Sequence, residues 1–534
     1  MMLSVASLPI IVFALPALLA AHILYSYFTN PLRRVPAAHP LSHFTNFWIH
    51  WVRWQAIENA TLKEAHARLG PIVCLGPDEI SVNCVKGGLR DVYTGGFEKS
   101  NGNYNWYDYF TNYNGTPNMF STGGNKAHSS RKRTLSNIYS KSVVTASPAL
   151  LAQTSRIMYD RFLPYLARTF DQAAPGALNI YALLSASTMD IVTGYIFGLK
   201  ASSNLLDDPT ELTRFLDLYN SRRSFNYWGQ EFPGLTETLN KWFGYRFVPK
   251  FVEDANEDIE KWTLEMCDNA ANVLQQSDMN PEETPVVYQQ LSLALAKEAK
   301  KSGDNKPNLR FPVASELLDH LAAGFDTSGI TLTYVVHELS KHPDIQSKLR
   351  QELLDLSRLI IPSSAPILPD PKEVDSLPYL NAVILESLRL HSAIPGPQPR
   401  FTPPQGCRLG PEEQDYFIPG GIRVSASAGL LHLNEQVYPS PEEWRPERWL
   451  EEVDEDRKKD MESRWFWAFG SGGRMCVGSH LAIYQMKYIV AALYSNYTTH
   501  IVDDTGIQQI DAYTAPPTSD KLMIRLEKHV NNTG

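Results

Sequence analysis

The chain has 534 residues, of which 43% are hydrophobic, 20% charged and 11% aromatic. These values are typical of a globular protein with a large core and exclude a disordered chain. The net charge of −9 argues against a protein that binds nucleic acid through a broad basic surface. Its 5 cysteines are widely spaced and include no C-x-x-C pair, which argues against a disulfide scaffold or a zinc knuckle.

The first predicted element is an apolar run from Ser7 to Phe28 that contains no acidic or basic residue other than His22. A helix of about 20 residues suffices to cross the hydrocarbon layer of a bilayer. Arg33 and Arg34 follow the run and no basic residue precedes it, so the positive-inside rule places the body in the cytosol. A cleaved signal peptide is the alternative, but its basic n-region is missing. We therefore expect residues 1–29 to form an uncleaved, single-pass membrane anchor.

The rest of the chain reads as a proline-rich hinge with the start of the body (30–60) and one large catalytic domain (61–534). Hydrophobic periodicity predicts a fold that is mainly α with small β-sheets. The predicted helices cover Pro148 to Leu199, Val252 to Leu274, Val313 to Lys341, Pro343 to Leu356, and Pro378 to Leu390. The predicted strands lie near residues 71, 80 and 421 and at Leu522 to Leu526.

Two aromatic-rich stretches, Asn103 to Phe110 and Phe225 to Phe232, interrupt the helical pattern. Such residues usually pack in loops or in the core, but they can also form the wall of an apolar ligand pocket. Their position in the sequence does not decide between these two interpretations.

Near the C-terminus, the stretch FGSGGRMCVG (469–478) surrounds Cys476 with glycines and is followed by an apolar helical pattern. The thiolate would lie at a helix N-terminus, where free N–H groups favour negative charge. Gly470, Gly472 and Gly473 allow a turn with unusual dihedral angles, and Gly478 would let a flat ligand lie against the first helical turn. Arg474 could pair with a carboxylate of that ligand. Together these features describe haem held by an axial cysteine.

This loop resembles the haem-binding signature of the cytochrome P-450 superfamily at every defined position: Phe469, Gly472, Arg474, Cys476 and Gly478. The order of further motifs supports the resemblance. ESLR provides Glu386 and Arg389, and WRPERW provides Arg448. In the family these three residues form a buried structural lock, although a lone Glu–Arg pair at this spacing is usually a solvated surface pair.

The stretch AGFDTS (323–328) interrupts the apolar pattern of the long helix before that lock. A kink, or a hydroxyl bonded to the preceding turn, would explain it without a function. The resemblance implies an oxygen-binding notch on the distal face of the haem. There Gly324 leaves room for dioxygen, while Asp326 and Thr327 deliver protons and are the catalytic residues.

Three further haem contacts follow from the resemblance. His128 and Lys132 lie where the family places its propionate-binding helix, and Arg400 lies where an arginine is often directed to a propionate. Lone basic clusters are more often solvated surface.

The resemblance implies a haem-thiolate monooxygenase that inserts one oxygen atom of O2 into a lipophilic small molecule. The cofactor would be haem b. NADPH would be used indirectly, through a membrane-bound NADPH–cytochrome reductase, with cytochrome b5 as a further candidate partner. The anchor and the PERW variant resemble microsomal enzymes of filamentous-fungal secondary metabolism, bound to the endoplasmic reticulum with a cytosolic catalytic domain.

Candidate contacts for the reductase are Lys126, Arg131, Lys132 and Arg133, with Arg457, Lys458 and Lys459. Two other functions stay open at this stage. One is a haem-thiolate isomerase or dehydratase that acts without a reductase; such enzymes commonly lose the acid–threonine pair that is present here. The other is a haem sensor or carrier, which would not need the distal notch.

Overall fold

The computed structural model describes residues 21, 23, 25, 28–172, 177–304 and 307–529. The predicted membrane anchor therefore lies almost wholly outside the described residues. Among the described residues, one helix is long and apolar enough to cross a membrane, α8 (Ile180–Phe197), and 94% of it is buried inside the protein. Length and composition alone do not distinguish such a core helix from a membrane span.

The chain divides into two compact units. The first comprises Met1–Tyr104 and Gly396–Leu431, and the second comprises Asn105–Pro395 and His432–Gly534. The sequence predicted one body from residue 61 onwards. The segment 396–431 belongs to the first unit because it returns to the N-terminal sheet, where β7 (Arg423–Ser425) pairs in parallel with β2 (Glu79–Val82). Pairing between such distant parts of the chain does not change the local composition, so the sequence alone could not predict it.

The first unit is built on a four-stranded sheet in the order β1-β2-β7-β4, with a separate hairpin of β5 and β6. Residues 30–46, which include the predicted hinge, form turns and no helix. The elements of the first unit are α2 (Phe47–Trp54), α3 (Glu58–Leu69), β1 (Ile72–Gly76), β2 (Glu79–Val82), η1 (Val85–Thr94), β4 (Arg400–Phe401), β5 (Cys407–Leu409), η7 (Glu412–Gln414), β6 (Tyr416–Ile418), β7 (Arg423–Ser425) and α18 (Ala428–Leu431).

The second unit is mainly helical, with one small sheet in the order β3-β9-β8. Its elements up to residue 301 are η2 (Trp106–Phe110), α4 (Asn125–Leu135), α5 (Lys141–Ala146), α6 (Pro148–Arg156), η3 (Ile157–Phe162), α7 (Leu163–Gln172), β3 (Leu178–Asn179), α8, α9 (Pro209–Ser221), η4 (Arg223–Phe225), α10 (Asn226–Glu231), α11 (Pro233–Phe243), α12 (Lys250–Val273), η5 (Pro281–Glu283) and α13 (Val286–Lys301).

The later elements of this unit carry the cysteine loop and the predicted lock. They are α14 (Arg310–Lys341), α15 (Pro343–Leu353), η6 (Pro362–Ser364), α16 (Pro371–Asp375), α17 (Pro378–Leu390), η8 (Pro446–Trp449), α19 (Glu455–Lys459), η9 (Asp460–Arg464), η10 (Gly472–Arg474), α20 (Ser479–Asn496), β8 (Tyr497–Asp503) and β9 (Met523–Lys528).

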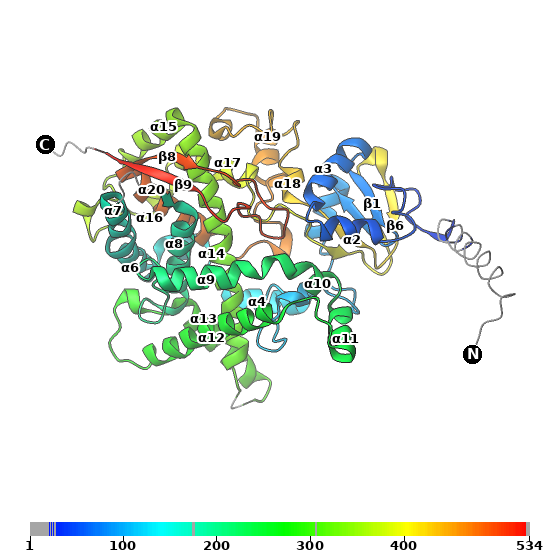
Figure 1. Ribbon diagram of the computed structural model, residues 1–534, viewed down its shortest axis with the longest axis horizontal. Helices are drawn as coiled ribbons and strands as arrows, with labels where there is room; N and C mark the ends of the chain where they lie inside the picture. The colour runs from blue at the N-terminus through cyan, green and yellow to red at the C-terminus, as the bar shows by residue number, and fades with distance from the viewer. Residues whose placement is uncertain are drawn as a thin grey trace. The chain divides into compact units, whose positions relative to one another are not determined.

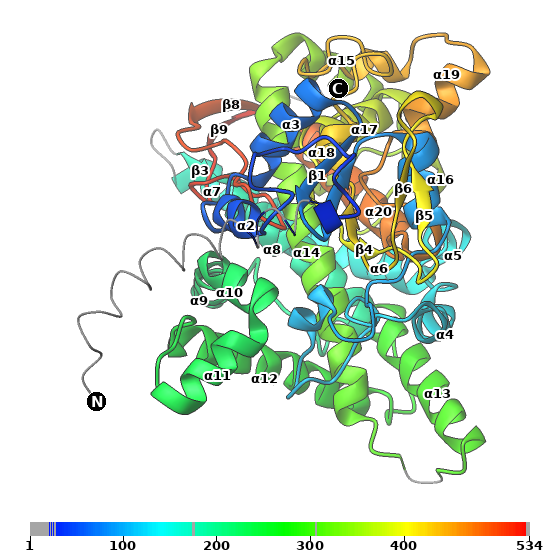
Figure 2. The ribbon, with the colours of Figure 1, turned by 90° about the vertical axis from the view of Figure 1, so that its right-hand side faces the viewer.

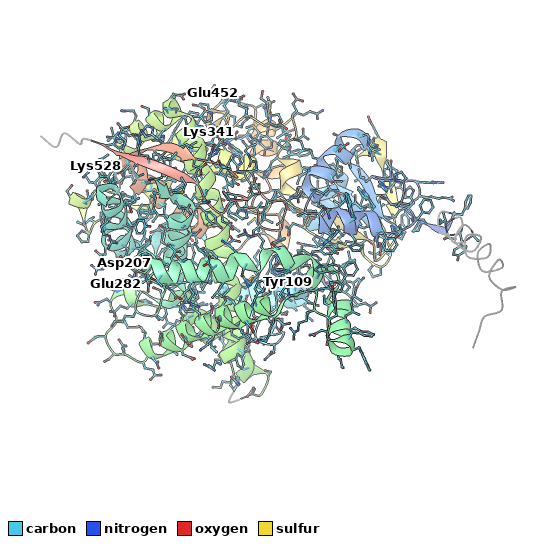
Figure 3. All side chains as sticks on the ribbon, viewed as in Figure 1. Tyr109, Asp207, Glu282, Lys341, Glu452 and Lys528 are labelled. Carbon is cyan, nitrogen blue, oxygen red and sulfur yellow. The ribbon has the colours of Figure 1, made fainter. Side chains whose placement is uncertain are left out.

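The 32-residue helix α14 packs against the shorter helix α8 in the second unit (Figures 1 and 2). Its C-terminal end is at Lys341, which is labelled in Figure 3. Both helices are apolar around most of their circumference, as expected for helices buried on several sides. Two glycines allow this close approach. A Cβ at Gly324 would lie 2.9 Å from a methyl carbon of Val192, and one at Gly329 would lie 3.2 Å from the Ser185 hydroxyl oxygen.

The predicted fold class, mainly α with small sheets, is confirmed. Helices α12, α14, α15 and α17 lie within about three residues of their predicted bounds, an ordinary uncertainty for helix ends. Strands β1, β2, β7 and β9 lie at the predicted places.

Candidate active site

The loop 469–478 forms a tight turn that presents Cys476 just before helix α20. The backbone N–H of Cys476 donates to the carbonyl of Phe469 at 2.9 Å. Gly470 and Gly472 have φ angles of +70° and +69°, which L side chains rarely adopt. The expectation of unusual dihedral angles is thus confirmed for these two glycines, whereas Gly473 has no positive φ.

The Cys476 thiol is accessible at the surface of the folded chain, yet protein surrounds it closely. Burial raises its pKa, and the N–H groups of Gly478 and Ser479 together with the Lys132 charge oppose that rise. These N–H groups belong to the start of α20, as the sequence predicted. A ligand can therefore reach the sulfur, and a bound metal ion would stabilise the thiolate.

Helix α4 is fastened to the cysteine loop by two basic side chains. Lys132 Nζ donates to the carbonyls of Gly473 and Met475 at 3.1 and 2.8 Å. The Arg474 guanidinium donates to the carbonyls of Thr122 and Gly123, both at 2.5 Å.

Arg474 also donates to Asn125 Oδ1, at 3.2 Å from Nε and 3.0 Å from Nη2. These contacts are with neutral oxygens at and just before the start of α4, and the predicted pairing of Arg474 with a carboxylate of the ligand stays a prediction. His128 lies buried in the same helix. The contacts of Lys132 and His128 with a haem propionate stay predictions.

The interruption in α14 is a short exposed stretch within a buried helix. Ala323 is exposed and Thr327, one turn later, is half-buried. Leu321 and Phe325, which lie two residues before and two residues after Ala323, are buried. The Thr327 hydroxyl donates to the Ala323 carbonyl at 2.8 Å, which is the bond to the preceding turn that the sequence left open. The exposed Ala323 and the half-buried Thr327 therefore lie on one face of the helix.

Gly324 serves a different purpose from the one predicted. Its missing side chain faces Val192 of α8, where a Cβ would be too close for normal packing. The glycine thus allows two helices to approach, and Ala323 provides the exposed surface that was expected of Gly324. Only the position of α8 reveals this difference.

Asp326 is buried, with 2% of its surface exposed, and its carboxylate accepts a hydrogen bond from the Tyr219 hydroxyl at 3.3 Å. Burial raises its pKa, whereas the Arg223 charge and hydrogen bonds from Thr514 and Tyr219 oppose the rise. A buried acid with a raised pKa can hold a proton nearer to neutral pH than an exposed one.

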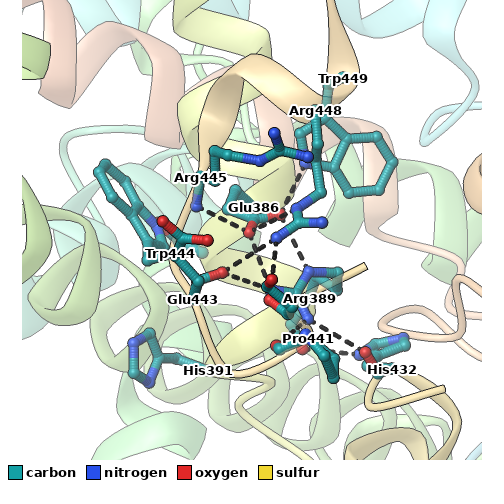
Figure 4. Close-up of polar contacts among 12 residues, drawn as sticks. Glu386, Arg389, His391, His432, Pro441, Glu443, Trp444, Arg445, Arg448 and Trp449 are labelled. Atoms are coloured by element: carbon teal, nitrogen blue, oxygen red, sulfur yellow. Dashed lines mark hydrogen bonds and ion pairs between the residues drawn. The ribbon is translucent and has the colours of Figure 1, made fainter. Parts of the chain in front are cut away.

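The predicted lock residues are brought together in the structure (Figure 4). Arg389 binds Glu386 through two hydrogen bonds, from Nε at 2.9 Å and Nη2 at 2.8 Å, and Arg448 Nε donates to the same carboxylate at 2.9 Å. All three side chains are at most 1% exposed. The Arg445 backbone N–H and the Trp449 indole N–H also donate to Glu386, each at 2.9 Å. A buried carboxylate with five such donors is fully compensated.

His432 connects the lock to the cysteine loop, a link that no sequence motif indicated. Its Nδ1 lies 2.9 Å from the Arg389 carbonyl, and its Nε2 accepts a hydrogen bond from the Trp467 backbone N–H at 2.7 Å. The Trp467 carbonyl accepts from Gly470 N–H, and its indole donates to Ser471. Since one ring nitrogen faces a carbonyl and the other an N–H, the arrangement fits one neutral tautomer. Burial lowers the pKa of His432 to about 3.

The two aromatic stretches contact each other. The Tyr109 hydroxyl, on a residue labelled in Figure 3, donates to Asn226 Oδ1 at 2.7 Å, and the Trp106 indole donates to Glu231 Oε1 at 3.0 Å. The Tyr513 ring, from the C-terminal loop, lies 5.5 Å from that of Trp106. Ring contacts thus join the first stretch to the C-terminal loop, and hydrogen bonds join it to the second stretch; these three segments together are called the aromatic cluster.

Arg400 lies on β4 in the first unit, where it is buried with its guanidinium 4.9 Å from the centre of the Tyr93 ring. Its Nη1 donates to the carbonyl of Pro399 at 2.7 Å. Its predicted role at a propionate stays a prediction.

The residues of the second unit fit a flat, iron-bearing ligand. A Cβ on Gly473 or Gly478 would meet no other heavy atom within 4 Å, so the loop has open space on this side. Gln485 of α20 donates to the Gly324 carbonyl at 3.2 Å, which brings α20 to the exposed stretch of α14. An accessible thiol, open glycines and an exposed stretch of a core helix together suit haem with a cysteine ligand.

Comparison with known proteins gives one consistent result. The family model described as cytochrome P-450 matches residues 38–523. The chain is 26% identical over 513 residues to the cytochrome P-450 monooxygenase hkm5 of Aspergillus hancockii, covering 93% of this chain and 91% of the relative. It is 28% identical over 438 residues to the monooxygenase avaI of Aspergillus versicolor, covering 79% and 94%. It is 26% identical over 490 residues to ucsK of an Acremonium species, covering 89% and 88%.

Proposed function

The chain belongs to the cytochrome P-450 family, and on this basis we propose that it is a haem-thiolate monooxygenase. It inserts one oxygen atom of O2 into a lipophilic small molecule, an intermediate of fungal secondary metabolism. The observation that carries this proposal is the enclosed but accessible Cys476 at the start of α20. Relatives from Aspergillus and Acremonium support the fungal assignment.

Cys476 would hold the iron of haem b, and Gly473 and Gly478 would leave room for the porphyrin. Bound haem supplies the activation of dioxygen, and a thiolate ligand favours cleavage of the O–O bond. The turn from Phe469 to Cys476 fixes the sulfur, because backbone hydrogen bonds and two left-handed glycines leave it little freedom.

Asp326 and Thr327 would supply protons. The Thr327 hydroxyl uses its hydrogen in the bond to the Ala323 carbonyl, so its lone pairs remain able to accept a hydrogen bond from a group that brings a proton. Asp326 has a raised pKa and can act as the acid that reloads this site.

The substrate is proposed to be mainly apolar. The aromatic cluster offers ring faces and edges, and the two arginines close to it already have partners. Arg222 Nη1 donates to Asn256 Oδ1 at 2.6 Å, and Arg223 Nη1 pairs with Asp520 at 3.0 Å. Neither contact pattern calls for a substrate carboxylate.

Electrons would come from NADPH through a membrane-bound reductase, with cytochrome b5 as a further partner. The Lys132 contacts place α4 beside the cysteine loop, and Lys126 and Arg133 of the same helix are exposed. Because such a complex is held by charge, Lys126→Glu should raise the reductase concentration needed for half-maximal reduction, most clearly at low salt.

We also propose that residues 1–29 anchor the enzyme in the membrane of the endoplasmic reticulum, with the catalytic domain in the cytosol. Phe47, Trp51 and Trp54 of α2 are exposed at spacings of four and three, which places them on one helix face. In the second unit, Trp242 and Phe243 of α11 are also exposed. Exposed tryptophans suit a bilayer interface.

The membrane proposal has two tests. The full chain should float with phosphatidylcholine vesicles, and a chain lacking residues 1–29 should bind them more weakly; equal binding would contradict the anchor. Four N-x-S/T sequons begin at Asn59, Asn114, Asn496 and Asn531. Asn114 is exposed, so a glycan there would contradict a cytosolic body.

The experiment that tests the function uses the haem-loaded protein. Dithionite and carbon monoxide should give the difference spectrum of a thiolate-ligated haem, and Cys476→Ala should abolish it. A metabolite comparison between a knockout strain and its parent should identify the substrate. Product formation should then require NADPH and reductase. Product without either would favour the isomerase or dehydratase, and a thiolate spectrum without turnover would favour a sensor or carrier.

A further inference from the structure

The carboxylate of Asp326 points away from the residue with which it is expected to work. Consecutive helical residues project about 100° apart, because a turn contains about 3.6 residues. Thr327 lies on the exposed face of α14, whereas Asp326 is buried against α9 and the C-terminal loop. Asp326 must therefore be held, released or rotated by groups other than Thr327.

Tyr219 of α9 holds one oxygen of this carboxylate. Its hydroxyl donates to Asp326 Oδ2 at 3.3 Å. The tyrosine ring packs edge-on against Phe325 at 4.8 Å and stacks with Phe215 at 5.9 Å. The Arg222 guanidinium lies over the ring, 4.6 Å from its centre. Three contacts with the ring thus fix the direction of its hydroxyl.

The Thr514 side chain, in the C-terminal loop, is a second polar group that interacts with the Asp326 carboxyl and opposes the rise in its pKa. The backbone N–H of the next residue, Ala515, donates to the Ala393 carbonyl at 2.9 Å and so fastens this loop. Asp326 therefore links three segments that are distant in sequence. The charged and titratable groups that face it are Tyr219, Arg222 and Arg223 from α9 and η4, Tyr181 from α8, and Asp520, which is paired with Arg223.

We propose that Tyr219 and Thr514 are positioning residues for Asp326: their hydroxyl groups hold its carboxyl turned away from Thr327 and set how readily it takes up and gives up a proton. This inference rests on the proposed function, in which Asp326 supplies protons. Tyr219 lies four residues before η4, which continues into α10, where Asn226 binds Tyr109 of the aromatic cluster. The residue that binds Asp326 is thereby connected through the chain to the aromatic cluster, which is proposed to contact the substrate.

The first test observes the carboxyl group itself. Infrared difference spectra of the haem-loaded enzyme would identify the protonated carboxyl band of Asp326 as the band lost in Asp326→Asn. Tyr219→Phe keeps the ring and removes the hydroxyl. Because this hydroxyl stabilises the charged carboxylate, its loss should raise the midpoint of the band's titration by about one pH unit. Thr514→Val should move it in the same direction and serves as a second variant if Tyr219→Phe folds poorly.

Tyr195→Phe is the matched control, since the Tyr195 hydroxyl is also buried but donates to the Ile138 carbonyl at 2.6 Å. It should leave the midpoint unchanged. An unchanged midpoint in both Tyr219→Phe and Thr514→Val would overturn the inference, as would an equal shift in the control.

The second test uses NADPH, reductase and dioxygen without substrate, and measures hydrogen peroxide formation against pH. One limb of this pH profile should be due to Asp326 and should be absent in Asp326→Asn. In Tyr219→Phe the midpoint of that limb should lie about one pH unit higher. The two tests separate the two ideas. If Asp326→Asn leaves the pH profile and product formation unchanged, the proton-supply role fails, while the infrared shift would still establish the contact with Tyr219.

Discussion

The buried lock offers the sharpest prediction about stability. Glu386→Gln keeps the shape of the side chain but removes the negative charge between Arg389 and Arg448. The carboxylate accepts three guanidinium hydrogen bonds, one indole hydrogen bond and one from a backbone N–H. The amide has one acceptor oxygen, and its NH2 group would face donors. Two arginines would remain buried without their counter-ion.

Removing one partner of a buried ion pair typically costs about 3–5 kcal/mol, against a total stability of about 5–15 kcal/mol. Urea denaturation of the haem-loaded protein, followed by circular dichroism, should show a loss of this size. Glu443→Gln is the matched control: its side chain is exposed, and its carbonyl rather than its carboxylate binds Arg389 at 3.1 Å. It should change the free energy of unfolding by less than about 0.5 kcal/mol. The reasoning is refuted if Glu386→Gln loses less than about 1 kcal/mol.

Three further predictions concern the packing and the cysteine loop. Gly324→Ala should lower the melting temperature, since overpacking costs about 1–3 kcal/mol, and adding Val192→Ala should restore much of the loss; no recovery would contradict the close contact. Since burial lowers the pKa of His432 to about 3, the unfolded state binds more protons between about pH 3 and 6.5, so stability should rise with pH there by up to about 1.4 kcal/mol per unit. His432→Gln should flatten that slope in denaturation measured at several pH values, and an unchanged slope would contradict the assignment. Trp467→Phe removes the indole donor to Ser471 and should weaken haem retention during gel filtration without changing helix content. Equal retention would show that this hydrogen bond does not hold the cysteine loop in its haem-binding geometry.

Local patterns in the sequence predicted much of the fold. Helix α17 begins at Pro378 and ends at Leu390, as the apolar periodicity and the initial proline indicated. The spacing of Glu386 and Arg389 already placed both side chains on one face of that helix. The position of Cys476 before an apolar helical pattern likewise predicted its place at the start of α20.

Long-range packing decided several contacts that local patterns did not predict. The glycine at 324 was assigned to a ligand, but it faces Val192, which is more than a hundred residues away. Arg474 also binds the chain just before α4, a contact that no local pattern indicated. The link through His432 depends on segments that meet only in the folded chain, and no local pattern marks it.

By itself the sequence determined the chemistry that this protein carries: a cysteine in a glycine-rich turn, an acid and an alcohol in a core helix, and a glutamate and arginine one helical turn apart. These features depend on the periodicity and dihedral preferences of neighbouring residues. Only the tertiary structure decided where Asp326 points and that His432 joins the lock to the cysteine loop. The reason is physical: the direction and protonation of a buried polar group depend on the partners that packing brings to it.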